Sequence, residues 1–138
     1  MSTSRRRASE AEAEPAFALK RAGRSAEAAR AFAELALRFP EDRAVVGVLA
    51  GLYQYELKRP DLAIPLWQRI LAAVPTNERA SVCLFHALDA LGDEMGAFRE
   101  LLRFQSISHS DDFAEIFSEA MTHEYYRNIV EQLRAEGL

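Results

Sequence analysis

Two stretches of the sequence carry the same pattern and decide the fold class. Residues 25–40 read SAEAARAFAELALRFP, and residues 60–75 read PDLAIPLWQRILAAVP. A small residue, two large apolar residues and a proline recur 35 positions later: Ala28, Phe32, Leu35 and Pro40 match Ala63, Trp67, Ile70 and Pro75. Spacings of three and four residues place the apolar side chains on one face of a helix, which the proline ends. The sequence therefore predicts two equivalent amphipathic helices.

A third copy of the pattern follows 34 positions after the second, at Ala97, Leu101 and Phe104. Another apolar segment precedes each copy, and its equivalent positions are Ala16, Gly51 and Phe85. The turn between the two segments carries Gly23, Lys58 or Gly92, each five residues before the small residue of the second segment. Each copy is therefore predicted to form two helices joined by a tight turn.

Short polar residues mark where several of these helices begin. Asp42, Asn77 and Asp93 precede apolar segments, and such side chains accept hydrogen bonds from the free N–H groups of a first helical turn. Pro60 suits the first position of a helix because its φ is preset. Pro65 falls inside the same helix, where we expect a slight bend and not a break.

This repeat resembles the tetratricopeptide repeat (TPR) over residues 9 to about 109, with matching small, aromatic and proline positions in copies one and two. The resemblance implies an all-α fold, a right-handed α-solenoid of antiparallel helix pairs, with three TPR-like pairs over residues 10–109. The first helices match the family less well, because Leu19, Gln54 and Leu88 stand where an aromatic residue is usual. His109 stands near the end of the third copy, which lacks the closing proline.

Residues 110–138 are predicted to form C-terminal capping helices, which cover the last open apolar face of a solenoid. Ser110 or Ser108 can cap the first of them, and Thr122 can start the second. Apolar residues recur at helical spacing in both: Phe113, Ile116, Phe117, Ala120, Met121, Tyr125, Tyr126, Ile129, Val130 and Leu133. In a competing interpretation, four aromatic residues of this set form a dimerisation or ligand-binding surface: Phe113, Phe117, Tyr125 and Tyr126.

The two ends of the chain differ in charge. Residues 1–30 hold seven basic and four acidic side chains, whereas residues 105–138 hold two basic and seven acidic ones. We expect residues 1–9 to be a disordered basic arm that keeps the chain soluble. Two other hypotheses would also explain the charge difference: copies of the chain associate head-to-tail, or the basic arm binds an acidic partner. Three arginines at positions 5–7, without an accompanying basic surface, do not predict nucleic-acid binding, so we expect no nucleic-acid partner.

Composition narrows the class of protein. The chain has 138 residues, 49% apolar and 28% charged, with a net charge of −4. This mixture is typical of one globular domain and excludes a wholly disordered chain. Cys83 is the only cysteine, so no internal disulfide forms. Acidic residues, not an apolar stretch, follow the arginines at 5–7, and no segment is long and apolar enough for a membrane span. We therefore expect a cytoplasmic protein without a membrane partner.

No pattern of catalytic or metal-ligating residues is complete. His123-Glu124 begins like a zinc-protease helix, but position 127 is Arg, so the second ligand is missing. His109 with Asp111 and Asp112 offers metal-ligand atoms, yet acidic residues in a first helical turn explain this segment better. The glycines are scattered, which excludes a phosphate-binding loop. We expect no enzyme activity, no metal and no cofactor.

The resemblance to the TPR family also implies where a partner binds, because the first helix of each pair lines a concave groove. The matching positions are Glu10, Ala13, Phe17, Lys20 and Arg21 in copy one, Val45, Val48, Leu52, Tyr55 and Glu56 in copy two, and Arg79, Val82, His86 and Asp89 in copy three. We expect Val45, Val48, Leu52 and Val82 to form an apolar strip with charges beside it. An alternative is that the chain's own last helix or arm covers this strip.

Such a groove suits an extended or helical segment of another protein. We therefore expect a small protein-binding adaptor. Two alternatives are a three-repeat bacterial secretion-type chaperone for one client, and a self-associating scaffold such as a homodimer. The family's clamp for acidic chaperone tails uses lysine, asparagine and arginine, whereas the matching positions here are Ala13, Phe17, Val48, Leu52, Val82 and His86. We expect no binding of such tails.

Overall fold

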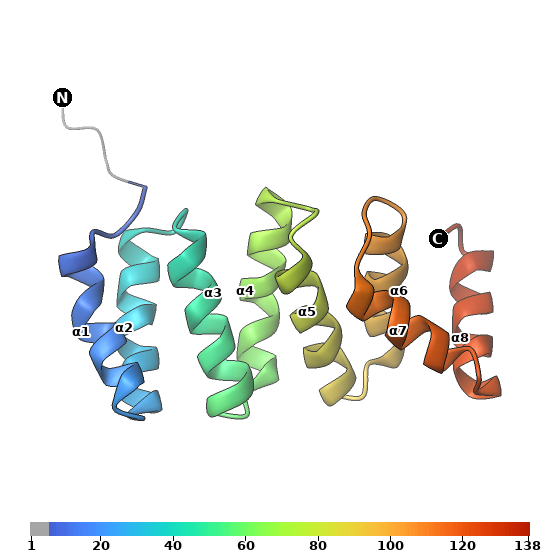
Figure 1. The fold of residues 1–138 in the computed structure, drawn as a ribbon, viewed down its shortest axis with the longest axis horizontal. Coiled ribbons are helices and arrows are strands. Elements are labelled where there is room, and N and C mark those ends of the chain that lie inside the picture. The colour runs from blue at the N-terminus through green and yellow to red at the C-terminus, as the bar shows by residue number, and fades with distance from the viewer. Residues whose placement is uncertain (1–5) are drawn as a thin grey trace. The chain divides into compact units, whose positions relative to one another are not determined.

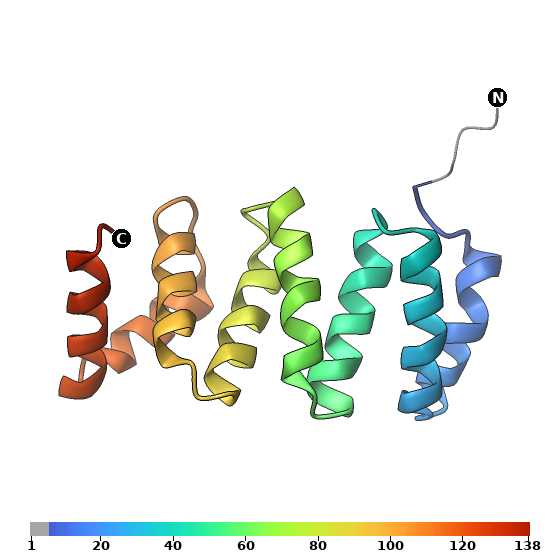
Figure 2. The same ribbon diagram turned by 180° about the vertical axis from the view of Figure 1, so that it is seen from behind.

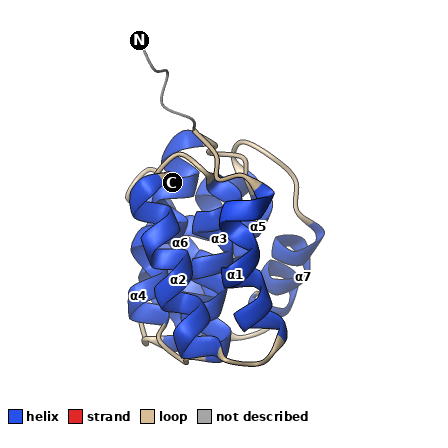
Figure 3. Cartoon of the chain, turned by 90° about the vertical axis from the view of Figure 1, so that its left-hand side faces the viewer, coloured by secondary structure: helices blue, strands red, loops and turns tan. Residues whose placement is uncertain are grey.

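The computed structural model describes residues 6–138, and all regular structure in that range is helical (Figure 3). The all-α prediction is confirmed. The described elements are α1 (Glu10–Arg21), α2 (Ser25–Arg38), α3 (Arg43–Gly51), the π-helical turn η1 (Leu52–Glu56), α4 (Pro60–Ala73), α5 (Glu78–Ala90), α6 (Glu94–Gln105), α7 (Asp111–Ala120) and α8 (Glu124–Ala135). Within residues 6–138, every helix is too short or too polar to span a lipid bilayer.

Side-chain caps begin the helices where the sequence predicts them. The carboxylate of Asp42 accepts a hydrogen bond from the Val45 N–H, and Asn77, Asp93 and Ser110 cap α5, α6 and α7 in the same way. These contacts satisfy backbone N–H groups that have no partner inside the helix. Thr122 was expected to start the last helix, but α8 begins after His123, which makes no side-chain cap. Pro65 lies inside α4 and does not break it.

Three turns of the chain share a backbone conformation. Gly23, Lys58 and Gly92 all have positive φ, at 75°, 55° and 82°. Each lies just beyond the C-terminal end of a helix, where the left-handed conformation lets the chain turn away from the direction of that helix. These are the positions that the sequence repeat places in register, so Lys58 fills a place that glycine holds in the other two copies.

The small and large residues of the repeat are buried alike. Ala28, Ala63 and Ala97 are each 0% exposed, and Phe32, Trp67 and Leu101 are at most 1% exposed. An alanine at such a place lets neighbouring helices approach closely, and a large side chain fills the space beside it. Each large side chain contributes about 1.5–3 kcal/mol to folding through burial of its apolar surface.

The chain divides into two compact units, the first ending at Leu66 and the second spanning Trp67–Leu138. In the first unit, α1 lies beside α2, and α3 packs against α2 (Figures 1 and 2). The ring of Phe17 meets that of Phe32 edge-on, with 4.9 Å between the ring centroids. Arg38 on α2 pairs with Glu12 on α1 at 2.7 Å. Apolar packing and an ion pair therefore both connect the two helices.

The N-terminal end of the described chain is held against α3. Ala8 donates its N–H to the carboxylate of Asp42 at 2.9 Å, and Ser9 forms a reciprocal capping box with Glu12 at the start of α1. Residues 1–9 were expected to form a disordered arm. Residues 1–5, including Arg5, lie outside the described residues, whereas Ala8 and Ser9 make specific hydrogen bonds.

In the second unit, α5 and α6 pack together and α8 packs against α6. Phe113 from α7 is fully buried, with ring centroids 5.8 Å from Phe85 and 5.6 Å from Phe104. Val130 and Leu133 of α8 join the same core. In Figure 1, α7 runs obliquely between α6 and α8, which stand nearly parallel to each other. This angle determines the shape of the candidate site.

Candidate functional site

Three of the predicted groove residues in the first unit are buried, namely Ala13, which is 7% exposed, and two members of the expected apolar strip. Val45 is 4% exposed and Leu52 is 2% exposed. The expectation that they line an open apolar strip is therefore wrong. The reason is that α3 is mostly apolar and packs against α2, and η1, which begins at Leu52, packs against α2 as well. Val48 is half-buried, at the edge of this packed surface.

The other predicted residues of the first unit lie at its surface or close to it. Phe17 is half-buried against Phe32, and Tyr55 is 47% exposed within η1. The charged members are exposed: Lys20, Arg21 and Glu56. Arg21 is paired with Glu14. In the π-helical turn, the Leu57 N–H donates a hydrogen bond to the carbonyl of Leu52, five residues earlier. The side chains after Leu52 therefore have directions that differ from those of a continuous α-helix.

A small cavity of about 270 Å³ lies between α1 and α3. Its apolar floor comes from Ala13, Phe17 and Val45. Glu10, Glu14 and Asp42 supply its acidic groups. Asp42 already receives hydrogen bonds from Ala8 and Val45, so its carboxylate has a structural role in capping α3.

The predicted residues of the second unit all lie on α5. Arg79, His86 and Asp89 are exposed and Val82 is half-buried. The Arg79 guanidinium lies over the Trp67 ring, 5.8 Å from its centroid, so packing orients this cation. The His86 ring meets Phe85 edge-on at 5.4 Å. Asp89 lines a substantial cleft of this unit.

That cleft, of about 430 Å³, opens where the four helices of the second unit meet, and we call it the α5–α8 cleft. Its lining residues are Phe85 and Asp89 of α5, Phe98 of α6, Ile116, Glu119 and Ala120 of α7, and His123 and Tyr126 at the start of α8. Such a volume falls within the roughly 300–1,000 Å³ typical of ligand pockets. Three of these lining residues come from α7, which runs obliquely in Figure 1.

Aromatic rings form the floor of the α5–α8 cleft. Phe85 and Phe98 meet edge-on with 5.4 Å between centroids, and Tyr126 lies 5.5 Å from Phe98. His123 meets Tyr126 edge-on at 6.0 Å. Rings that hold each other in edge-to-face contacts present a fixed apolar surface. The floor is therefore suited to receive an apolar side chain.

Most of the cleft residues were not predicted as a site. Asp89 was among the expected groove residues, and a competing interpretation gave Tyr126 to a dimerisation or ligand surface, whereas Ile116 and Ala120 were assigned to capping helices. Their apolar periodicity gave the helix face correctly. The angle at which α7 crosses its neighbours depends on packing between helices distant in sequence, and no local pattern encodes it.

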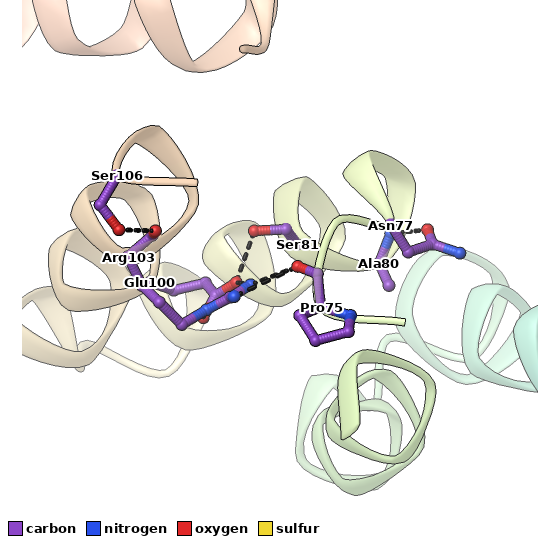
Figure 4. A network of polar contacts seen from close by, with 7 residues as sticks. All are labelled: Pro75, Asn77, Ala80, Ser81, Glu100, Arg103 and Ser106. Carbon is purple, nitrogen blue, oxygen red and sulfur yellow. Dashed lines mark hydrogen bonds and ion pairs between the residues drawn. The ribbon is translucent and has the colours of Figure 1, made fainter. Parts of the chain in front are cut away.

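A buried polar network fixes α5 against α6 beside this region (Figure 4). Ser81 donates its hydroxyl to Glu100 at 2.5 Å, and Glu100 also accepts two hydrogen bonds from Arg103. Arg103 further donates to the Pro75 carbonyl at 3.2 Å, which ties in the turn before α5. The Glu100 hydrogen bond is the largest cause that raises the pKa of Arg103. The network satisfies a buried carboxylate and holds the helices in register.

Among residues 6–138, no cluster of three or more histidine, cysteine or acidic side chains has the geometry to hold a metal ion. His109 instead contacts Asp111 at 2.8 Å, at the start of α7. Cys83 is buried, as expected for a small core residue. Comparison with models of known protein families, with curated proteins and with solved structures finds no match to this chain.

Proposed function

We propose that this chain is a small, non-enzymatic protein-interaction module. It holds a helical or extended segment of a partner protein in the α5–α8 cleft. The observation that carries the proposal is the combination of a fixed aromatic floor with exposed charged side chains at its edge. Apolar anchors seated in a pocket, with polar groups around them, are the arrangement that gives protein interfaces most of their affinity.

The proposal includes a TPR-like fold, a right-handed α-solenoid of antiparallel helix pairs. Two observations support it. The turns at Gly23, Lys58 and Gly92 share one backbone conformation at the repeat spacing. The small and large residues of the second helices are buried alike in all three copies. In such a fold α7 and α8 act as the capping helices, and the cleft lies where the last repeat meets its cap.

Affinity capture followed by a binding measurement tests this function. Proteins captured from a cell extract by the wild-type chain are identified and purified, and their affinity is measured by isothermal titration calorimetry. Ile116→Glu places a charge on the apolar lining and should weaken binding at least about tenfold, since it removes an apolar contact and buries a carboxylate. Circular dichroism confirms that each variant remains folded, and Ile116→Ala serves if Ile116→Glu does not.

The matched control is Leu37→Glu, which makes the same kind of change at a side chain 83% exposed on α2. It should leave the affinity unchanged. Equal binding by wild type and the Ile116 variants would contradict the assignment of the cleft. Loss of binding in Leu37→Glu alone would move the interface to α2. Leu52→Glu is not a suitable test variant, because that side chain is buried and the change would test folding and not binding.

A further inference from the structure

The structure carries one inference about the chemistry of the partner, and it rests on the proposed function. We propose that the α5–α8 cleft selects a basic segment of a partner protein. This segment has an apolar or aromatic anchor side chain flanked by lysine or arginine. The argument comes from the charges at the rim of the cleft, from their lack of internal partners, and from the pairing of the chain's own basic residues.

The rim of the cleft is acidic. Asp89 at the end of α5 and Glu119 near the end of α7 both line it and are both exposed. His123 and Tyr126 are the other ionisable residues of the lining, which contains neither lysine nor arginine. A cleft with one sign of charge beside a low-dielectric wall attracts the opposite charge and raises its local concentration. The electrostatics therefore favour a cationic occupant.

Neither rim carboxylate is neutralised within the described chain. Asp89 and Glu119 make no ion pair or side-chain hydrogen bond with another residue in 6–138, whereas Glu100, Asp111 and Glu136 of the same unit each have a partner. A carboxylate that is free in the isolated chain can pair with a guanidinium or ammonium without first breaking an internal contact. Both carboxylates are thus available to a partner.

A second copy of this chain is a poorer occupant. Five basic residues of the first unit already pair with acidic residues of that unit, namely Arg6 with Glu41, Arg21 with Glu14, Arg24 with Glu27, Arg38 with Glu12 and Arg59 with Asp61. In the second unit, Arg99 and Arg103 are paired, and Arg134 lies over the Phe117 ring. Docking any of these arginines on the cleft of a second copy would break a contact that it already makes, whereas a foreign basic segment would break none.

The apolar floor sets the second requirement. Phe85 and Phe98 are 5% and 3% exposed, so only a side chain that enters the cleft reaches them. A charged residue alone would leave this aromatic surface uncovered, and an apolar residue alone would leave the two carboxylates unpaired. A segment with an apolar anchor and a basic residue about one helical turn away satisfies both.

A peptide display library of random sequence, selected on the immobilised full chain, tests the inference. Peptides that bind wild type and lose affinity for Ile116→Ala, a change that leaves the charge of the cleft unaltered, are sequenced. We expect them to share an apolar or aromatic residue with two or more lysine or arginine residues within about one helical turn. Cleft-dependent peptides that are neutral or acidic would overturn the inference and leave the proposed function standing. Failure to select any cleft-dependent peptide would overturn both.

The selected peptide, synthesised with a fluorophore, then tests the two carboxylates by anisotropy. The double variant D89N/E119Q should bind about five- to tenfold more weakly at low salt, as expected for two exposed ion pairs. The control E34Q/E131Q removes two exposed carboxylates outside the cleft and should bind like wild type. The difference between the two variants should shrink at about 0.5 M salt, where screening is strong.

Two further results would contradict the inference. Equal binding by D89N/E119Q and E34Q/E131Q would show that the attraction comes only from net charge. A wild-type dimer in sedimentation that D89N/E119Q dissociates would make a second copy the occupant.

Discussion

The hydroxyl of Ser81 on α5 donates a hydrogen bond to the carboxylate of Glu100 on α6, with 2.5 Å between the oxygens, and both residues are buried (Figure 4). This contact connects two residues that are 19 positions apart in the sequence. It is also the only connection of Ser81 to a charged group among the described side chains. The pair is therefore a specific polar contact within an otherwise apolar packing surface.

We predict that Ser81→Ala lowers the free energy of unfolding by about 1.5–3 kcal/mol, the range for hydrogen bonds to charged groups. Urea denaturation measures it. Glu100→Ala should cost at least as much, because it also removes the partner of Arg103. In a double-mutant cycle the two changes should couple by about 1 kcal/mol or more. Additive effects would contradict a direct interaction between the two side chains.

Lys58 is predicted to be a site of conformational strain. Its φ of 55° costs a residue with a Cβ about 1–2 kcal/mol relative to glycine, whereas Gly23 and Gly92 adopt the same region freely. Because glycine also gains entropy in the unfolded chain, Lys58→Gly should raise stability by about 0.5–1 kcal/mol net. The matched change Gly92→Ala should lower it by about 1 kcal/mol. Thermal denaturation of both variants tests the assignment, and a destabilised Lys58→Gly would count against it.

Phe113 decides between the two interpretations of the C-terminal aromatics. It is 0% exposed and contacts Phe85 and Phe104, so Phe113→Ala should lower the free energy of unfolding by about 3–5 kcal/mol. Leu37→Ala removes an apolar side chain that is 83% exposed and should change stability by less than about 0.5 kcal/mol. A small effect at Phe113, measured by urea denaturation, would instead favour a surface role.

Tyr125 should contribute a pH-dependent term to stability. Its hydrogen bond to Glu94, the largest cause, raises the pKa of the phenol above the ordinary value of 10.0. Since the folded pKa is the higher one, the contribution is complete below pH 10 and is lost as the pH rises through the folded value. Wild type should therefore lose stability in that alkaline range relative to Tyr125→Phe. The tyrosinate absorbance of the two proteins should differ by a component that titrates above pH 10, and identical stability profiles would exclude the contact.

The local features of this fold could be predicted from sequence, because short-range chemistry determines them. Asp42, Asn77 and Asp93 cap helices, since each places an acceptor beside free N–H groups. The burial of Ala28 and Trp67 follows from helical spacing. Lys58 lies at the turn position that the repeat predicts, although its residue type gives no hint of a left-handed backbone.

The candidate site could not be predicted in the same way. Periodicity shows which side of α3 is apolar but not which residues its neighbours cover, so the assignment of Val45 and Leu52 to an open groove was wrong. The α5–α8 cleft depends on the oblique course of α7. In α7, Phe113 packs against Phe85 of α5 and Phe104 of α6, and these contacts exist only in the assembled unit.

Trp67 gives the molecule a built-in optical probe. It is the only tryptophan in the chain, it is 1% exposed, and the Arg79 guanidinium lies over its indole. Its fluorescence will therefore report when α4 and α5 separate, without any label. Because tyrosines occur in both units and tryptophan in the second alone, the two emission signals together can reveal whether one half of the chain melts before the other.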